Sequence, residues 1–101
     1  MMEFVEVAAK GLGRLLVARG VDPERLHVHV SEIAPGTRPH PPHTHPGLEA
    51  IYVLDGHGSV EVEGVAHPLG PGECILMDTT RLHGLVNTGS ARMRYLVIIT
   101  P

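Results

Sequence analysis

Several residue types that often decide a protein's chemistry are scarce or missing from this 101-residue sequence. Tryptophan is absent and aromatic residues make up 3% of the chain, so no stacking platform for a sugar or a nucleobase is evident. Cys74 is the only cysteine, which excludes a disulfide within the chain. Any chemistry must therefore come from other residue types.

Positive charge is also scarce. The net charge is −3 with neutral histidines, and no basic run is longer than one residue. Because binding to phosphate backbones needs clustered Lys and Arg, we expect no nucleic-acid partner. No stretch approaches the roughly 20 apolar residues of a membrane helix, and the start lacks the positive segment of a signal peptide. We therefore expect no membrane partner and a cytoplasmic location.

What remains is an ordinary globular composition, with 43% hydrophobic and 19% charged residues. Its length suits one domain, so we expect a single domain over residues 1–101. Twelve Gly and nine Pro divide the chain into short apolar segments at the spacing of a β-sandwich or barrel. An all-β chain must protect its sheet edges, and a closed barrel or a jelly roll does so.

The expected strands have clear boundaries in most of the chain. They cover residues 26–30, 48–54, 59–63, 65–69, 73–77, 83–86 and 92–100. Asp55-Gly56 is a hairpin signal that would pair the strand at 48–54 with that at 59–63. Residues 12–18 fit either a strand or a helical turn. Asp22 followed by Pro23 predicts one helical turn.

The most informative segment is the run from His43 to Glu49, which reads H-x-H-x3-E. His43, His45 and Glu49 share parity, so in an extended chain their side chains project to one side. Gly47 lies between them without a side chain to obstruct. A second segment, residues 72–87, supplies His83. The alternatives are a solvated loop for the first three residues and a hydrogen-bonded barrel-rim histidine for His83.

Three neutral imidazoles and one carboxylate suit a single divalent transition metal ion: Fe, Mn, Zn, Ni, Co or Cu. Four protein ligands in an octahedron leave two positions for water, substrate or dioxygen. The absence of cysteine ligands argues against a structural zinc site.

Other polar residues are weaker candidates. Arg38, His40 and Arg81 lie near the two segments and are candidates for contact with a substrate or with the metal ligands. For His40 and Arg81 a solvated loop position is the alternative. His27 and His29 share one face of a strand, and a half-exposed sheet face is favoured over a place in a pocket.

Two further residues have simple structural predictions. Tyr52 has the opposite parity to Glu49, so we expect it on an outer sheet face or in a dimer contact. Cys74 lies between Glu73 and Ile75 in an apolar strand, where it is expected to be a small buried filler.

The two segments resemble the two motifs of the cupin family, and the chain is similar to small single-domain bacterial cupins of the Cupin_2 type. The first motif, residues 36–56, and the second, residues 72–87, match at the following positions: Gly36, His43, His45, Glu49, Gly56, Gly72, His83 and Asn87. The second motif departs from the usual pattern at Asp78 and Thr80, where the family usually has Pro and Gly.

The resemblance implies a single-domain cupin jelly-roll β-barrel, or double-stranded β-helix, with little helix. It implies that His43, His45, Glu49 and His83 are metal ligands inside the barrel. It also implies a homodimer and a small-molecule ligand. The expected function is a metal-dependent oxygenase or isomerase. The alternatives are a non-catalytic module that binds or senses a small ligand at its metal, and a purely structural metal barrel.

Overall fold

The computed structural model describes residues 3–101, and nearly all regular structure in them is β. The strands are β1 (Phe4–Val7), β2 (Leu15–Ala18), β3 (His27–Ile33), β4 (Leu48–Asp55), β5 (Gly58–Val62), β6 (Val65–Leu69), β7 (Cys74–Asp78), β8 (His83–Asn87) and β9 (Met93–Ile99). A short 3-10 turn, η1 (Pro23–Arg25), is capped by the Asp22 side chain, as predicted. Within this part of the chain, no helix is long and apolar enough to cross a membrane.

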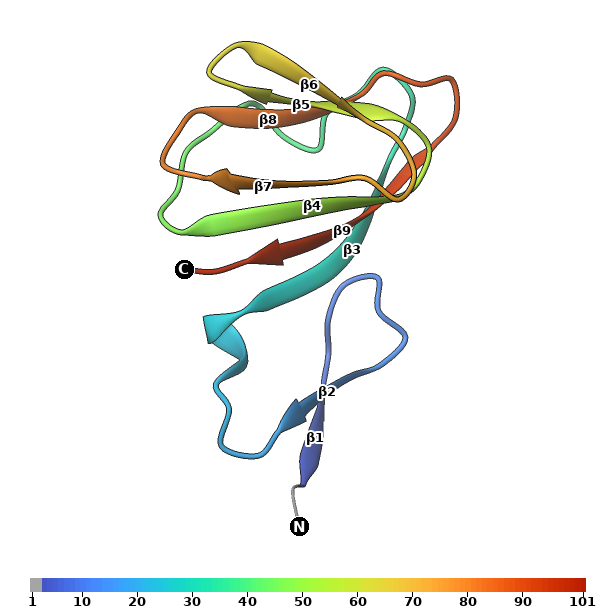
Figure 1. The fold of residues 1–101 in the computed structure, drawn as a ribbon. Coiled ribbons are helices and arrows are strands. Elements are labelled where there is room, and N and C mark those ends of the chain that lie inside the picture. The colour runs from blue at the N-terminus through green and yellow to red at the C-terminus, as the bar shows by residue number, and fades with distance from the viewer. Residues whose placement is uncertain (1–2) are drawn as a thin grey trace.

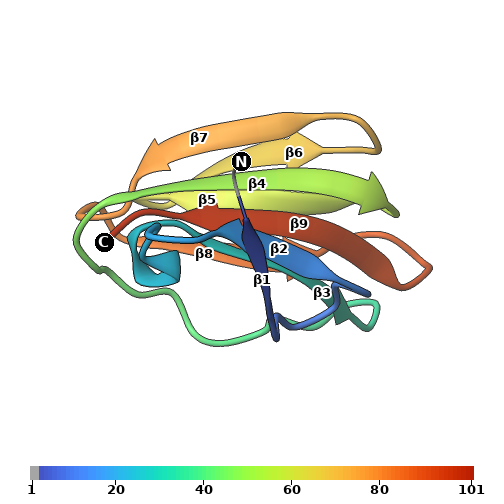
Figure 2. The same cartoon turned by 90° about the horizontal axis from the view of Figure 1, so that it is seen from below.

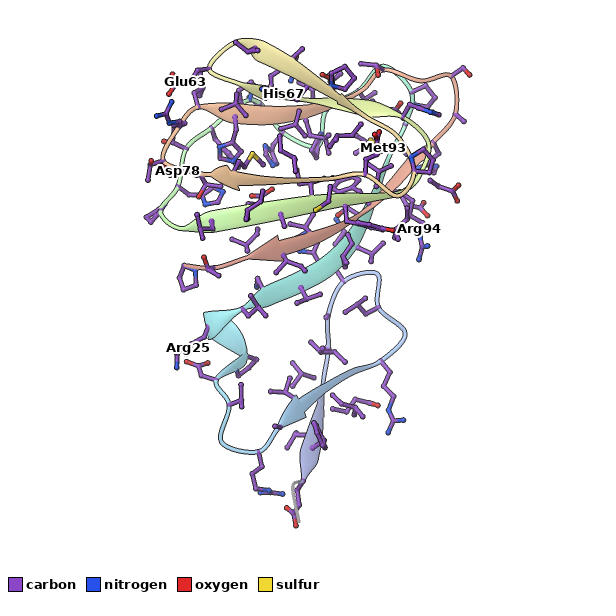
Figure 3. All side chains as sticks on the ribbon, viewed as in Figure 1. Arg25, Glu63, His67, Asp78, Met93 and Arg94 are labelled. Atoms are coloured by element: carbon purple, nitrogen blue, oxygen red, sulfur yellow. The ribbon has the colours of Figure 1, made fainter. Side chains whose placement is uncertain are left out.

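Two antiparallel sheets face each other and form the barrel (Figure 1). One has the strand order β3-β9-β4-β7, and the other has the order β6-β5-β8. Strand β4 alternates as an amphipathic strand should, with Glu49, Ile51 and Val53 buried between the sheets. Met93, labelled in Figure 3, is fully buried in the same core. The predicted all-β jelly roll is therefore confirmed.

The predicted hairpin between β4 and β5 is wrong. β4 pairs with β7 and β9, whereas β5 pairs with β6 and β8, so the turn at Asp55-Gly56 carries the chain from one sheet to the other. A turn signal reports local backbone conformation but not which strands become neighbours. Here Gly56 has a φ of +79°, and a Cβ on it would lie 2.8 Å from the Arg92 carbonyl oxygen. The turn is thus packed against the start of β9.

The N-terminal strands β1 and β2 form a separate hairpin that projects away from the barrel (Figure 1). Figure 2, seen from below, places this hairpin in front of β3 and β9. The loop between its strands returns to the barrel, where the Val30 amide donates to the Lys10 carbonyl oxygen over 2.9 Å. Residues 15–18 therefore form a strand rather than a helical turn, and β1 is a strand that the sequence pattern did not indicate.

The outer face of the four-stranded sheet carries many apolar side chains. The register places Val28 and Ile98 side by side, and Tyr52 beside Leu96. Tyr52 faces outward, as its parity predicts, with 38% of its surface exposed, and Leu76 is 70% exposed. Cys74 lies on this same exposed face, so the prediction of a buried filler is wrong. When both faces of a strand carry apolar side chains, the sequence pattern does not indicate which face is covered by the rest of the protein.

Candidate metal centre

Three histidines converge at one end of the barrel. The ring nitrogens of His43, His45 and His83 that face one another all lie within 4.8 Å. His43 and His45 belong to the segment that leads into β4, and His83 begins β8. Glu49 on β4 completes the group, with its Oε1 3.2 Å from His45 Nε2 and 3.9 Å from His83 Nε2. The structure thus brings together the four side chains that the motif spacing singled out.

Main-chain hydrogen bonds hold the two segments in register. His43 and His83 form an isolated β-bridge, with N–H···O distances of 2.9 and 3.0 Å, and the His45 amide donates to the Thr79 carbonyl oxygen at 2.9 Å. The pairing extends no further as a ladder, because the prolines at 41, 42 and 46 have no amide hydrogen to donate. Of the three ligands in this first segment, only Glu49 lies in a regular strand, and His43 and His45 precede it.

Thr79 and Gly47 fix the turn between His45 and Glu49. The Thr79 side chain is fully buried, and its hydroxyl donates to the carbonyl oxygens of Gly47 at 2.8 Å and Pro46 at 3.2 Å. Gly47 has a φ of +97°, and a Cβ there would lie 2.0 Å from the Thr100 carbonyl oxygen. Glycine is therefore required for its backbone conformation and for close approach of the C-terminal strand, in addition to leaving the site unobstructed.

Two of the histidines are held in one tautomer. His83 Nδ1 lies 2.8 Å from the Arg81 carbonyl oxygen, and His45 Nδ1 lies 3.1 Å from that of Pro46. Because a carbonyl only accepts, each Nδ1 must carry the proton and each neutral ring presents an Nε2 lone pair to the cluster. His83 Nε2 is buried and has no hydrogen-bond partner among residues 3–101. A backbone partner on the second ring nitrogen is typical of metal-binding histidines.

The electrostatics of the cluster favour a neutral imidazole at His43. The pKa of His43 is lowered, first by burial and then by the neighbouring His40, His83 and His45 rings, whose charged forms would repel it. When the rings are neutral with Nδ1 protonated, the Nε2 atoms of His45 and His83 are acceptors, and they face Glu49 Oε1 at 3.2 and 3.9 Å. A cation is the group that satisfies acceptors gathered in this way. The residues present therefore fit a divalent transition metal.

Comparison with known proteins identifies the family. The Cupin_2 model, described as a cupin domain, matches residues 29–99. The chain belongs to the cupin family. No curated protein matches its sequence.

Solved structures similar to this cupin share its fold. A double-stranded beta-helix protein from Klebsiella pneumoniae is 21% identical with a TM-score of 0.71, and the match covers 81% of this chain and 72% of that one. A sugar phosphate isomerase of the cupin superfamily from Silicibacter pomeroyi is 25% identical with a TM-score of 0.70. That match covers 81% of this chain but only 53% of the isomerase, so the cupin spans about half of that protein's length.

A third structure matches over nearly its whole length. It is described as a predicted oxalate decarboxylase from Thermotoga maritima, and it is 22% identical with a TM-score of 0.70. The match covers 98% of this chain and 92% of that one. At this identity the likeness shows the fold alone.

The second motif of this cupin makes its turn without the usual proline and glycine. Asp78 Oδ1 accepts hydrogen bonds from the Thr80 amide at 3.0 Å and from the Thr80 hydroxyl at 2.6 Å. These bonds lower the pKa of Asp78, because they stabilise the carboxylate. The side-chain turn delivers the chain to Arg81 and then to His83, so the departures from the family pattern leave His83 beside the other ligands.

A cavity of about 330 Å³ opens next to the cluster. His29 is partly exposed, as expected, but it lines this cavity, which was the less favoured alternative. In β3, His29 and Ser31 face inward, whereas Val28 and Val30 face outward. Tyr95, a polar side chain in the predicted C-terminal strand, lines the cavity too. His40 also borders the cavity and stacks on His43, with ring centroids 4.1 Å apart.

Arg38 and Arg81, the two arginines proposed for substrate contact, are not among the described residues that line this cavity. Arg38 Nη2 is 2.8 Å from Glu61 Oε1, and the Arg81 side chain is 63% exposed with its guanidinium 3.9 Å from Glu63. Their contact with a substrate stays a prediction. Asn87, from the second motif, has a structural role: its Nδ2 donates to the carbonyl oxygens of Ile33 and Ala91.

Proposed function

We propose that this cupin is a metalloenzyme that holds one divalent transition metal ion through His43, His45, Glu49 and His83. The observation that carries the proposal is the buried His83 Nε2. Within residues 3–101 it has no hydrogen-bond partner, and it faces the Glu49 carboxylate across 3.9 Å, an arrangement that a metal ion bound between the two would satisfy. When bound, such a metal supplies Lewis-acid polarisation of a carbonyl or a site for oxygen chemistry.

The chain's own residues define what that chemistry would act on. Glu49 neutralises part of the metal's charge, and the Arg81 and Pro46 carbonyls keep His83 and His45 in the tautomer that binds. The cavity beside the cluster is near the lower end of the usual range for small-molecule sites. A small-molecule isomerase or oxygenase fits these features. The name of the Silicibacter protein, a sugar phosphate isomerase, supports the isomerase class.

Metal content measured by mass spectrometry on purified protein tests the proposal. We expect about one transition-metal ion per chain and its loss in His45→Ala, with turnover of any substrate found lost together with the metal. The exposed His67 on β6, labelled in Figure 3, offers the control, and His67→Ala should retain the metal. Protein that binds no metal would refute the proposal. Metal-dependent retention of a small molecule without turnover would favour a binding module instead.

We also propose that the cupin is a homodimer whose two copies cover each other's outer sheet face. Two apolar surfaces on one chain support this: the outer face of the four-stranded sheet, with Leu76 and Tyr52 exposed, and the projecting hairpin, with Phe4 54% and Leu16 43% exposed. An isolated two-stranded hairpin is marginally stable in water. In a two-fold pair, the same contact is made twice, so each hairpin would cover the partner's sheet.

A further inference from the structure

A second group of polar side chains lies in the cavity, away from the cluster. It consists of His29 on β3 and Tyr95 on β9, both on the inner face of the four-stranded sheet. His29 pairs with Val97, which pairs with Ile51, so His29 lies two strands from β4. That is roughly 9–10 Å of backbone separation, at about 4.8 Å per strand. Tyr95 lies one inward-facing row deeper, opposite Ser31.

Neither side chain is engaged by a strong partner. Within residues 3–101, His29 takes part in no side-chain hydrogen bond of standard geometry, and its ring borders the cavity. Tyr95 is 4% exposed and lies opposite Ser31, whose side chain lowers the pKa of the tyrosine by hydrogen bonding while burial raises it more. The Glu49 carboxylate raises the pKa of both His29 and Tyr95, although burial is the largest influence on each. That shared influence places both groups within electrostatic reach of the proposed metal ligands.

The groups facing His29 carry both signs of charge. Burial lowers its pKa most, Lys10 and His27 lower it further and Glu49 opposes them, so the neutral ring is favoured. A neutral imidazole both donates and accepts one hydrogen bond, and a tyrosine hydroxyl does the same. The pair therefore suits a hydroxyl or carbonyl group better than an anion.

The other residues that line the cavity also favour an uncharged ligand. Between the cluster and the His29–Tyr95 pair the wall is apolar: Ile51, Met77, Leu85, Val97 and Ile99. No Lys or Arg lines the cavity in the described part of the chain, and the nearby Arg38 is already paired with Glu61. At the His29–Tyr95 end, away from the proposed metal, a phosphate dianion would be buried without a cationic side chain, whereas proteins normally meet phosphate with Arg, Lys or a helix N-terminus.

We infer that the substrate is a small uncharged hydroxycarbonyl compound, and not a phosphate ester, with His29 and Tyr95 binding its far hydroxyl or carbonyl group. The inference rests on the proposed metal function, because one oxygen of the compound would lie at the metal. His29 and Tyr95 act as specificity-determining residues, and the short carbon chain lies against the apolar wall.

Two matched pairs of probes test this by NMR titration of the zinc-loaded protein: dihydroxyacetone with its phosphate, and 5-hydroxypentan-2-one with its phosphate ester. The amide and ring signals of His29 and Tyr95 report binding. Each neutral probe should bind at least tenfold more tightly than its ester. His29→Phe, or Tyr95→Phe where the first variant does not fold, should weaken the neutral probes at least fivefold with zinc content unchanged. His67→Phe, on an exposed strand position, should behave as the wild type.

Several results would overturn the inference: tighter or equal binding of the esters, no binding of either neutral probe, or unchanged affinities in both variants. Zinc content is measured first, so that failure of the proposed metal function is seen separately. If no zinc binds, the same titration of the metal-free protein still compares neutral probes with esters at His29 and Tyr95. A preference for the esters there would overturn the inference on its own.

Discussion

His43 and His83, from two distant segments, exchange a pair of main-chain hydrogen bonds at 2.9 and 3.0 Å, and their rings lie 4.8 Å apart. The two halves of the site are therefore joined by backbone as well as by side chains. Because main-chain bonds do not depend on the side chain, either histidine can be replaced without removing the bridge. This separates the loss of a metal ligand from the loss of the fold.

His83→Ala should reduce zinc affinity by more than about 100-fold, since loss of a hydrogen-bond partner of a ligand alone typically costs 10–100-fold. The backbone bridge remains, so the folded structure should persist. Competition with a chromophoric chelator measures the affinity, and circular dichroism checks the fold. His67→Ala, at an exposed position, is the control and should leave affinity unchanged. A zinc affinity in His83→Ala equal to that of the wild type would contradict the assignment of His83 as a ligand.

Thr79→Val should destabilise the fold by about 1–3 kcal/mol, because it removes a buried hydroxyl that donates to the Gly47 and Pro46 carbonyls. The same variant should weaken zinc binding, since those bonds set the turn between His45 and Glu49. Urea unfolding measures the stability. Thr44→Val is the matched control: Thr44 lies between two proposed ligands but is exposed, and a change within about 0.5 kcal/mol is expected. Equal effects of both variants would argue against this role of Thr79.

The local sequence pattern was enough to predict most of the strands and to place the proposed metal ligands together. The parity of His43, His45 and Glu49 indicated one shared side, and the four proposed ligands do meet. The sheet in which each strand lies was not predictable from turns: Asp55-Gly56 has hairpin chemistry but joins two sheets. Pairing is decided by contacts between segments distant in sequence, which no local pattern contains.

The inner and outer faces were also not predictable where both are apolar. In β3 the valines face outward and His29 faces the cavity, the reverse of the usual expectation that polar side chains face solvent. Alternation shows that two faces differ but not which of them is covered. Likewise, Asp78 replaces the usual proline before His83 through a side-chain turn whose hydrogen bonds appear only in three dimensions.

Gly47→Ala should destabilise the fold by about 1–3 kcal/mol from the backbone conformation alone, and by more if the C-terminal strand cannot move. The φ of +97° is unfavourable for alanine, and the new Cβ would meet the Thr100 carbonyl oxygen at 2.0 Å. Thermal unfolding measures the loss. Gly13→Ala is the control, because a Cβ there would meet nothing within 4 Å. Stability of Gly47→Ala matching that of Gly13→Ala would show that this close approach does not constrain the fold.

Leu76→Asp should convert the proposed dimer to a monomer. Leu76 is 70% exposed on the outer face of the four-stranded sheet, where a charge would have to be buried against the second copy. Light scattering coupled to size-exclusion chromatography gives the mass directly. Val65→Asp is the control: Val65 is 59% exposed but lies on β6, in the other sheet. A wild-type monomer, or a dimer unaffected by Leu76→Asp, would rule out this interface.

The metal-free protein should lose stability as pH falls below about 6.5, the usual pKa of histidine. The folded-state pKa of His29 is lowered, first by burial and then by Lys10 and His27, against the opposing effect of Glu49. The unfolded chain therefore binds a proton at a higher pH than the folded chain does. The stability contributed by neutral His29 is present above 6.5 and is lost as pH falls towards the folded-state pKa.

The change in unfolding free energy between pH 7.5 and 5.5 is measured in urea with chelator present, and because His43 also has a lowered pKa, the contribution of His29 is the difference between the wild type and His29→Gln. His29→Gln removes the titrating group at a cavity-lining position, so its stability should fall less over this range than that of the wild type. His67→Gln, at an exposed position, should follow the wild-type curve because its ring is not buried on folding. Parallel curves for the wild type and His29→Gln would show that His29 ionises equally easily in the folded and unfolded chains, and hence that its ring is not desolvated in the cavity.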